Sequence, residues 1–399
     1  MPSSKPKVHS SKDQKKRVLV CLSGGVDSSV TALLLLKQGY DVTGAFMVNY
    51  DDSKNIEQGT KNKKLVECWR KDYRDAVRVA AHLGIPLVRW DFTKEYARDV
   101  LRYMDAEYRA GRTPNPDVLC NEFVKFGAWL ERAKHEGFEY IATGHYATLR
   151  VEKPNTKFQT PNQLPITNYQ LLTPKDSDKD QTYFLHRLSQ DQLKHTLFPL
   201  GPYTKIQVRA LAKKHKLPTA QKEESMGICF IGEVPMKDFL QSRISQKKGK
   251  VVLEDGTIVG EHDGLAYYTI GQRHLSLNSK TPNTKKQKIN THQLPITKPL
   301  YVLSKNQQKN TLTLGPEESL YKKEITLENI HWIAGRPPKL PLQCEVRLRH
   351  RQALQKTVIE EQESGTIIAT FKKPQRAPTP GQFMVFYQKG VCLGGGLIV

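Results

Sequence analysis

The stretch SGGVDS, residues 23–28, decides how this 399-residue chain is interpreted. It follows the apolar run Arg17–Leu22 (RVLVCL), which is typical of a buried strand. It precedes Asp27–Gln38, whose apolar stripe ends at Gly39 and predicts a helix with a glycine C-cap. A glycine loop between a strand and a helix directs unpaired backbone N–H groups and the helix dipole toward an anion. We therefore interpret SGGVDS as a phosphate-binding loop.

This loop differs from the most familiar phosphate-binding sequence. The chain lacks GxxxxGK[ST] and with it the Walker lysine, which disfavours γ-phosphate transfer of that type. A bare SGG would more often be an ordinary turn, with Asp27 capping the helix that follows. Because the complete SGGVDS stands between a strand and a helix, phosphate binding is the stronger interpretation.

Strands and helices continue to alternate after this loop. Apolar strands separated by helices predict a parallel sheet covered on both faces, with ligands at the carboxyl ends of its strands. The N-terminal part is therefore expected to be an α/β domain. The expected elements are a strand over Tyr40–Val48, a helix along Tyr73–Leu83, a strand over Pro86–Phe92, a helix over about Lys94–Tyr108, a helix from Asn121 to His135 and a strand over Tyr140–Thr143.

The texture changes after about residue 230 to short β-rich runs with turn signals, which favour small antiparallel barrels. The tract QLPIT occurs twice, at residues 163–167 and 293–297, inside polar stretches that we interpret as loop insertions. We expect a flexible basic arm over 1–16, a catalytic domain over 17–232 with an insertion at about 152–168, a small central β-rich domain over 233–299 with an insertion at about 278–297, and a C-terminal β-barrel over 300–399.

Composition narrows the class of protein. Lys and Arg number 62 against 40 Asp and Glu, a formal charge of +22 that attracts polyanions and makes nucleic acid the leading partner, although such a charge can also serve only solubility. No run approaches the roughly 18–20 apolar residues of a membrane span, so we expect no membrane protein. The six cysteines contain no CxxC pair, which argues against a local zinc site, and no signal peptide is apparent. We expect the reducing, bacterial-type cytoplasm, with a mitochondrial location as the alternative.

SGGVDSS resembles the PP-loop of ATP pyrophosphatases, which cleave ATP between its α- and β-phosphates. Seven further stretches, in order, resemble the tRNA-specific 2-thiouridylase family: FMVNY, AGRTPNPDVLCN, ATGHYA, DKDQTYFL, GICFIGE, HDGLAYYTIGQRH and TPGQFMVFY with VCLGGGLI. The resemblance runs from about Arg17 to Val399. It implies an adenine nucleotide α-hydrolase-like first domain and a tRNA-binding final barrel.

The resemblance also implies the reaction. Members of the family replace the C2 oxygen of the wobble uridine in tRNA by sulfur, using ATP and magnesium to convert that oxygen into an adenylate. The expected partners are a tRNA of the Lys, Glu or Gln type and a persulfide donor, such as a cysteine desulfurase or a sulfur carrier. We expect a monomer.

Two cysteines stand out within these motifs. Cys120 ends a Pro-rich loop before a predicted helix whose N-terminus would favour a thiolate, and Asp117 lies three residues before it. The resemblance implies that Cys120 is a nucleophile, that Asp117 handles protons and that Cys229 carries a persulfide. We interpret the other four cysteines as structural: Cys21, Cys68, Cys344 and Cys392.

The resemblance assigns binding roles to further residues. ATP contacts are expected from Cys21, Leu22, Ser23, Gly24, Gly25, Val26, Asp27, Ser28, Met47 and Gly144, although Met47 could be plain strand core. The target base is expected near Asn115, Pro116 and Asp117. Contacts to the tRNA are expected from His145, Lys179, Asp180, Gln181, Arg349, His350 and Gln382. Two positions depart from the family pattern, since Met226 stands where Thr is usual and His350 where Tyr is common.

Several alternatives stay open at this stage. Cys120 could liberate sulfide that attacks the base, instead of resolving a persulfide bond. Asp117, Cys120 and Cys229 could together hold an iron–sulfur cluster. Another PP-loop ligase is the nearest enzyme rival, although it would need neither the paired cysteines nor a basic C-terminal barrel. A catalytically inactive RNA-binding module is the rival of another class, and the intact motif residues argue against it.

Overall fold

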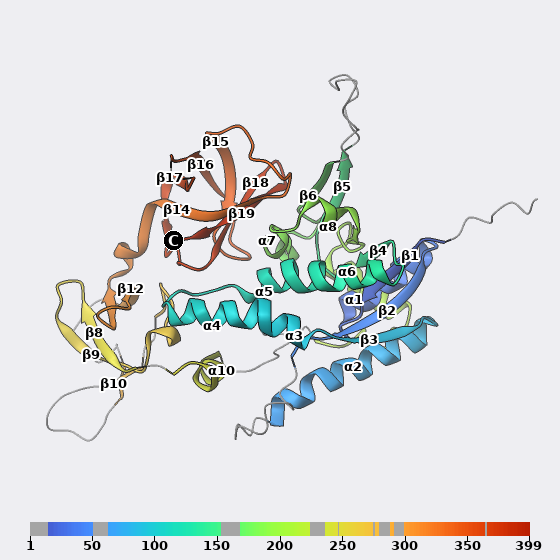
Figure 1. Cartoon of the computed structure of the whole chain (residues 1–399), viewed down its shortest axis with the longest axis horizontal. Helices are drawn as coiled ribbons and strands as arrows, with labels where there is room; N and C mark the ends of the chain where they lie inside the picture. The colour runs from blue at the N-terminus through green and yellow to red at the C-terminus, as the bar shows by residue number, and fades with distance from the viewer. Residues whose placement is uncertain are drawn as a thin grey trace, which may run out of the picture.

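The computed structural model has three parts, in chain order an α/β part, a small central sheet and a C-terminal barrel; along the molecule the barrel lies between the other two (Figure 1). The fold class expected from the sequence is confirmed. Cys229 and both QLPIT tracts lie outside the described residues. The structure describes residues 15–50, 63–152, 168–223, 236–245, 247–273, 276–278, 288–290, 299–363 and 365–399.

A parallel sheet forms the centre of the first part, with strand order β3-β2-β1-β4-β7. Along β1, Val18 and Val20 face one core cluster while Leu19 and Cys21 face another, and all four are buried. The sheet is therefore covered on both faces, as its uninterrupted apolar strands predict. Its strands are β1 (Arg17–Cys21), β2 (Asp41–Val48), β3 (Leu87–Asp91), β4 (Tyr140–Ala142) and β7 (Thr196–Leu197).

Two sets of helices cover the sheet. On one face pack α1 (Val26–Lys37) and α2 (Lys63–Leu83). On the other lie α3 (Thr93–Tyr96), the π-helical η2 (Ala97–Leu101), α4 (Arg102–Arg109), α5 (Pro116–Leu119), the π-helical η3 (Cys120–Ala128) and α6 (Trp129–His135). The helix expected to start at Asn121 in fact starts at Pro116, because Asn115 caps it by accepting a hydrogen bond from the Val118 N–H at 3.4 Å.

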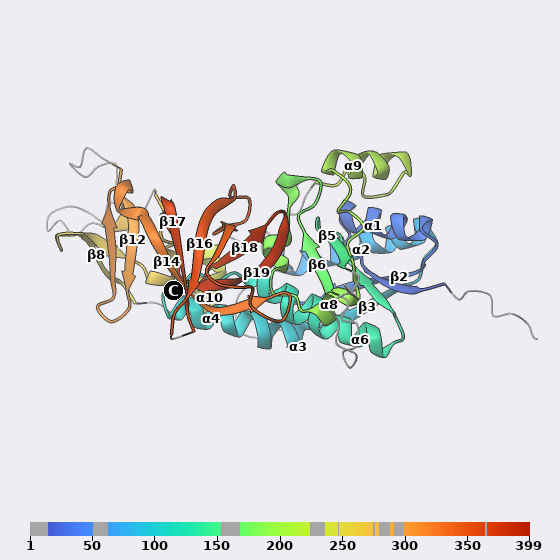
Figure 2. The same ribbon diagram turned by 90° about the horizontal axis from the view of Figure 1, so that it is seen from above.

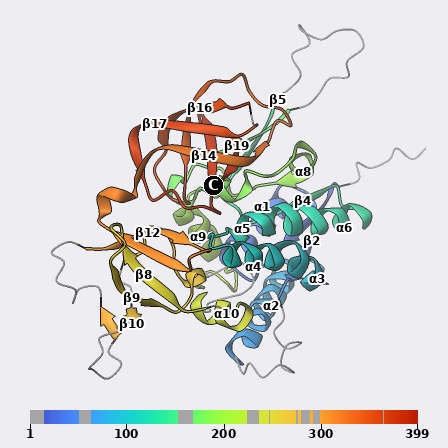
Figure 3. The same ribbon diagram turned by 60° about the vertical axis from the view of Figure 1, so that its left-hand side comes forward.

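Shorter helices complete the chain between the sheets: α7 (Thr182–Leu185), α8 (Gln190–Lys194), α9 (Lys205–Lys214) and α10 (Met236–Arg243). Capping boxes at Ser189 and Thr204 fix where α8 and α9 begin. Figure 2 shows α9 beside α1, on the outside of the α/β part. Arg243 in α10 pairs with Asp105 in α4 at 2.8 Å and joins the start of the central part to the helical face of the first (Figure 3).

The C-terminal part is a barrel of six strands, closed by the pairing of β14 with β19. Its sheet also takes in β5 and β6, the strands on either side of the first insertion, through pairing of β6 with β19. A hairpin of the expected catalytic domain thus belongs to the sheet of the barrel. The strands are β5 (Thr148–Glu152), β6 (Asn168–Leu172), β14 (Tyr321–Trp332), β15 (Leu342–Arg347), β16 (Gln355–Glu361), β17 (Ile367–Arg376), β18 (Phe383–Gln388) and β19 (Val391–Ile398).

The central sheet has strand order β11-β10-β9-β8-β13-β12. Its strands are β8 (Gly249–Leu253), β9 (Ile258–His262), β10 (Ser276–Asn278), β11 (Lys288–Asn290), β12 (Tyr301–Asn306) and β13 (Thr311–Gly315). We expected the barrel to begin at residue 300, yet β12 pairs with β13, and β13 pairs with β8 of the central sheet. The β-rich texture is the same on both sides of residue 300, and only the pairing separates the two sheets.

None of the helices that the structure describes has the length and apolar character to cross a membrane.

Candidate active site

The SGGVDS stretch forms a tight loop between β1 and α1. Gly24 has φ +75°, and a Cβ added there would lie 2.2 Å from the carbonyl oxygen of Asp72, so the position requires glycine. The Ser28 hydroxyl accepts a hydrogen bond from the Ser23 N–H at 3.2 Å and lies 3.2 Å from the Ser23 hydroxyl. Strand, loop and helix are arranged as the sequence predicts for an anion-binding turn.

Gly144 and Met47 are the expected ATP contacts outside the loop, and their positions differ. Gly144 follows β4, and a Cβ there would lie 2.9 Å from the Ser28 nitrogen, so the end of β4 lies directly against the loop. The Met47 side chain, only 3% exposed, packs into the core cluster that contains Cys21. Its position agrees with the alternative interpretation of Met47 as strand core.

Asp27 is the charged residue of the loop and has two partners that the motif does not contain. The Tyr146 hydroxyl donates to Asp27 Oδ1 at 3.0 Å, and Lys205 Nζ lies 2.7 Å from both carboxylate oxygens. A second lysine, Lys222, donates to the Gly24 carbonyl oxygen at 3.0 Å. Neither lysine is identifiable from the sequence, because Lys205 at the start of α9 and Lys222 in the coil beyond that helix lie outside every recognised motif.

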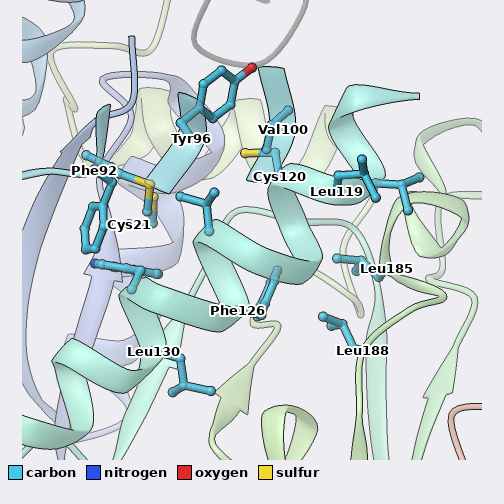
Figure 4. Close-up of a cluster of buried hydrophobic side chains, with 14 of the residues drawn as sticks. Cys21, Phe92, Tyr96, Val100, Leu119, Cys120, Phe126, Leu130, Leu185 and Leu188 are labelled. Atoms are coloured by element: carbon cyan, nitrogen blue, oxygen red, sulfur yellow. The ribbon is translucent and has the colours of Figure 1, made fainter. Parts of the chain in front are cut away.

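Cys120 lies inside the molecule at the first residue of η3. Its side chain is fully buried in the same cluster as Cys21, as Figure 4 shows. The side-chain amide of Asn49, one residue beyond β2, donates to Cys120 Sγ at 3.9 Å. Because the carboxyl end of β2 lies at the same edge of the sheet as the SGGVDS loop, the candidate nucleophile and the candidate nucleotide site meet there.

The surroundings of Cys120 differ from those expected. The helix begins one turn earlier than predicted, so Cys120 lies on its second turn and not ahead of its first N–H groups. Asp117 stands three residues before it in α5 and therefore on the same helical side. Asn49 is 2% exposed, and its Oδ1 has no hydrogen-bond partner among the described residues.

Burial changes the acidity of the three other buried thiols that the structure describes. Burial raises the pKa of Cys21 to about 11 and that of Cys344 to about 12. Burial also raises the pKa of Cys392. Because the thiolate is the nucleophilic form, these three are poor nucleophiles at neutral pH, in keeping with the structural role expected for them.

The barrel holds the loop that carries Asn115 and Pro116. Gln382 donates from Nε2 to the carbonyl oxygens of Thr113 at 2.7 Å and Pro114 at 3.1 Å, and its Oε1 accepts from Asn115 Nδ2 at 3.4 Å. Gln382 was expected to touch tRNA. The structure instead brings it together with the residues expected around the target base.

A second contact between barrel and catalytic part involves Asp180. This carboxylate is 2% exposed, pairs with Arg347 Nη1 at 2.6 Å and accepts from the Thr182 hydroxyl at 2.7 Å. His350 Nε2 donates to the Asp180 carbonyl oxygen at 3.1 Å, and its ring lies 4.5 Å from that of Phe184. The Asp180 carboxylate therefore serves the interface and not the solvent.

The remaining residues expected to contact tRNA have different surroundings. Gln181 Oε1 accepts from the Tyr146 N–H at 2.9 Å, and Lys179 is half-buried beside it. Arg349 is exposed and donates to the Ala377 carbonyl oxygen at 2.6 Å. Burial lowers the pKa of His145 well below its usual range, so its imidazole is neutral and suits a hydrogen bond or ring contact better than a phosphate ion pair.

The family models that match this chain follow one another in the same order as its three parts. Family models match at residues 16–233 (tRNA methyl transferase HUP domain), 237–316 (tRNA methyl transferase PRC-barrel domain) and 322–398 (aminomethyltransferase β-barrel domain). The tRNA-specific 2-thiouridylase MnmA of Enterococcus faecalis is 44% identical over 393 residues, 97% of this chain and 96% of that protein. The chain belongs to the tRNA-specific 2-thiouridylase family.

Other members of this family match almost as well. The protein of the same name from Halalkalibacterium halodurans is 43% identical over 96% of this chain and 95% of its own, and that from Listeria monocytogenes is 42% identical over 96% and 94%. Among solved structures, a 4-thiouridine synthetase–RNA complex with bound ATP matches at 15% identity over 57% of this chain and 50% of that chain. Its TM-score of 0.32 is too low to support a conclusion.

Within the part of the chain that the structure describes, no cluster of three or more His, Cys, Asp or Glu is arranged to hold a metal ion. Asp117 and Cys120 are described, whereas Cys229 is not. The three-residue set for an iron–sulfur cluster therefore stays a prediction.

Proposed function

We propose that this member of the family catalyses ATP-dependent 2-thiolation of the wobble uridine in tRNA. The observation that carries the proposal is the contact of Asn49 with Cys120 at the sheet edge that also holds the SGGVDS loop. One site can then present both an activating nucleotide and a sulfur-handling thiol to one base. Relatives at 42–44% identity that are named tRNA-specific 2-thiouridylases support the same reaction.

Activation comes first in the proposed mechanism. The C2 oxygen of uridine would leave as hydroxide, a poor leaving group, so the oxygen attacks the α-phosphorus of ATP and pyrophosphate leaves. The resulting adenylate has AMP as its leaving group. Backbone N–H groups of residues 23–25 and the N-terminus of α1 are suited to hold the phosphates. Magnesium would neutralise further phosphate charge, and the Asp27 carboxylate, whose side chain is 31% exposed, would hold the ion.

Sulfur transfer follows. The terminal sulfur of a Cys229 persulfide attacks C2, and AMP leaves with the original oxygen. The Cys120 thiolate, its proton taken by Asp117, then attacks the Cys229 sulfur. The electron pair of the broken S–S bond passes to the sulfur on C2, which gives 2-thiouridine and a Cys120–Cys229 disulfide. A two-electron thiol reductant reopens the disulfide, and a persulfide donor reloads Cys229.

The remaining predictions about tRNA belong to this proposal. The target base is proposed to lie by Asn115, Pro116 and Asp117, a loop that Gln382 holds against the barrel. Arg349 and the neutral His145 are proposed to touch the tRNA body. A monomer in the reducing cytoplasm would suit thiol chemistry of this kind.

The test is mass spectrometry of nucleosides from unmodified tRNA treated with the full chain, ATP, magnesium and a persulfide donor. We expect 2-thiouridine, formed with AMP and pyrophosphate. Formation of ADP and phosphate, or a methyl group in place of sulfur, would overturn the proposal.

Two variants divide the steps. Cys229→Ser should lose persulfide loading and thiolation but keep adenylation, whereas Cys120→Ser should load persulfide and fail to turn over. Cys344→Ala serves as the matched control and should keep thiolation, because Cys344 lies in the barrel core. A brown, iron-containing protein that uses free sulfide after anaerobic purification would replace the persulfide relay by the cluster alternative.

A further inference from the structure

Lys205 forms an ion pair with Asp27, the only acidic residue of SGGVDS, although the two are 178 residues apart in the sequence. Lys205 opens α9, directly after its Thr204 cap, and its Nζ lies 2.7 Å from both oxygens of Asp27. Its side chain is 13% exposed, and Nζ also lies 5.9 Å from the centre of the Tyr146 ring. Because Asp27 lies in the first turn of α1, the ammonium group is held where that helix directs its N–H groups.

The second lysine near this loop is bound in a different way. Lys222 Nζ donates to the Gly24 carbonyl oxygen at 3.0 Å, to Asp72 at 2.7 Å and to Asp75 at 2.6 Å. These three acceptors match the three donors of an ammonium group. Lys222 therefore ties the loop to α2, and its charge is already balanced by two carboxylates.

We propose that Lys205 is an ATP-binding residue that contacts the β- and γ-phosphates and stabilises the pyrophosphate as it leaves. This inference rests on the proposed function and adds to it a residue that the SGGVDS motif does not contain. Lys205 would take the place of the lysine that the Walker sequence supplies and this chain lacks. The acceptor is the pyrophosphate portion of a nucleoside triphosphate.

Charge balance favours this role. Asp27 pairs with Lys205, and Asp72 and Asp75 share Lys222, so a triphosphate that enters the loop adds negative charge beside carboxylates that two lysines only partly balance. Coulomb repulsion within a partly buried site opposes the binding of phosphates, and a lysine that moves toward them reduces this repulsion in addition to any magnesium. The four-carbon stem of a lysine allows such a movement by rotation about its own bonds, while Tyr146 keeps its hydrogen bond to Asp27.

Binding of AMP, ADP and ATP to the full chain tests the proposal by titration calorimetry. Lys205→Ala should weaken ATP binding about tenfold or more, which is the effect of a lost charge-assisted hydrogen bond. Its affinity for AMP should stay within about twofold, because AMP lacks the two outer phosphates. Lys205→Arg should recover part of the loss for ATP. The matched control is Lys214→Ala, an exposed lysine in the last turn of the same helix.

Two outcomes would overturn the inference. Equal losses for AMP and ATP would mean that Lys205 only holds Asp27 in place, and unchanged ATP affinity would mean that it does not reach the phosphates. If Lys205→Ala fails to fold, Lys205→Gln, which keeps a donor toward Asp27, is measured instead. Failure of the proposed function is seen separately, as wild-type protein that makes no 2-thiouridine, whatever the nucleotide affinities show.

Discussion

Asn49 is the residue that connects the nucleotide edge of the sheet with the candidate nucleophile. It stands just beyond β2, and its amide reaches Cys120 Sγ at 3.9 Å. A donor in this position stabilises the thiolate over the thiol. No motif rule identifies this role, because FMVNY contributes to the resemblance without showing which of its side chains faces a cysteine 71 residues away.

Asn49→Ala should slow thiolation by about threefold to tenfold, the effect of one lost hydrogen bond. Asn49→Asp should act more strongly, because a carboxylate beside Cys120 raises the pKa of the thiol. Its thiolation rate should therefore rise with pH at higher values than in wild type. Thiolation rates measured on pre-adenylated tRNA at a series of pH values would check this. An Asn49→Asp variant with the wild-type pH profile would show that the contact has no chemical role.

His186 links stability to pH. It is fully buried, its Nδ1 donates to the Tyr183 carbonyl oxygen at 2.7 Å, and burial lowers its pKa to about 3. Below about pH 6.5 the imidazole of His186 binds a proton in the unfolded chain, whereas in the folded chain it stays neutral down to about pH 3. The free energy of unfolding should therefore fall as the pH drops from about 6.5, by up to about 1.4 kcal/mol per unit from this residue.

Urea unfolding of His186→Asn at a series of pH values measures this contribution, since Asn keeps a donor for Tyr183. The variant should lose part of the acid destabilisation seen in wild type. His135→Asn, at an exposed position, is the control and should keep it. Equal pH slopes for wild type and His186→Asn would refute the assignment.

Among the elements, the contact between the barrel and the loop of residues 113–115 is held by backbone as well as side chain. Gly381 has φ +92°, and a Cβ there would lie 2.9 Å from the nitrogen and the carbonyl oxygen of Thr113. The Thr113 N–H donates to the Pro380 carbonyl oxygen at 2.9 Å. Only glycine allows two backbones to approach in this way.

Gly381→Ala should lower the free energy of unfolding by about 1–3 kcal/mol and reduce thiolation, because it strains the backbone and separates the loop from the barrel. Gly335→Ala is the matched control, with φ +73° and open space around its Cβ. It should show the backbone strain alone, about 1–2 kcal/mol, with thiolation retained. Thermal melting and single-turnover thiolation measure the two effects, and identical behaviour of both variants would count against the contact.

Elements were predictable from the sequence to the extent that their residues are contiguous. SGGVDS carries its own strand and helix, and the apolar runs of β1 and β2 have the continuous pattern of a doubly covered sheet. The start of α5 at Pro116 was missed, because the Pro-rich loop conceals the Asn115 cap. Lys205 and Gln382 were beyond prediction in these roles, since their partners lie 178 and up to 269 residues away. The pairing of β6 with β19 depends on tertiary contacts in the same way.

At the scale of the whole molecule, charge should govern association with tRNA. The formal charge of +22 predicts an affinity that falls steeply with salt, because bound phosphates release counterions. Arg349→Ala should weaken binding, lower the salt slope by about 1 and leave ATP affinity unchanged. Filter binding across a salt series measures this, with Arg336→Ala in another exposed loop as control. A salt-independent affinity, or the same slope change in both variants, would contradict the proposed contact.

During synthesis, the β5–β6 hairpin is made long before the strand with which it pairs. Its neighbour in the sheet is β19, so Leu171 and Leu172 leave the ribosome more than two hundred residues before Cys392 and Val391 arrive to pair with them. Throughout that interval the nascent α/β part carries an open strand edge, the kind of edge that invites wrong partners. A chain that stops before Val391 would therefore leave β6 without its partner β19, a defect in the first part of the protein as well as in the barrel.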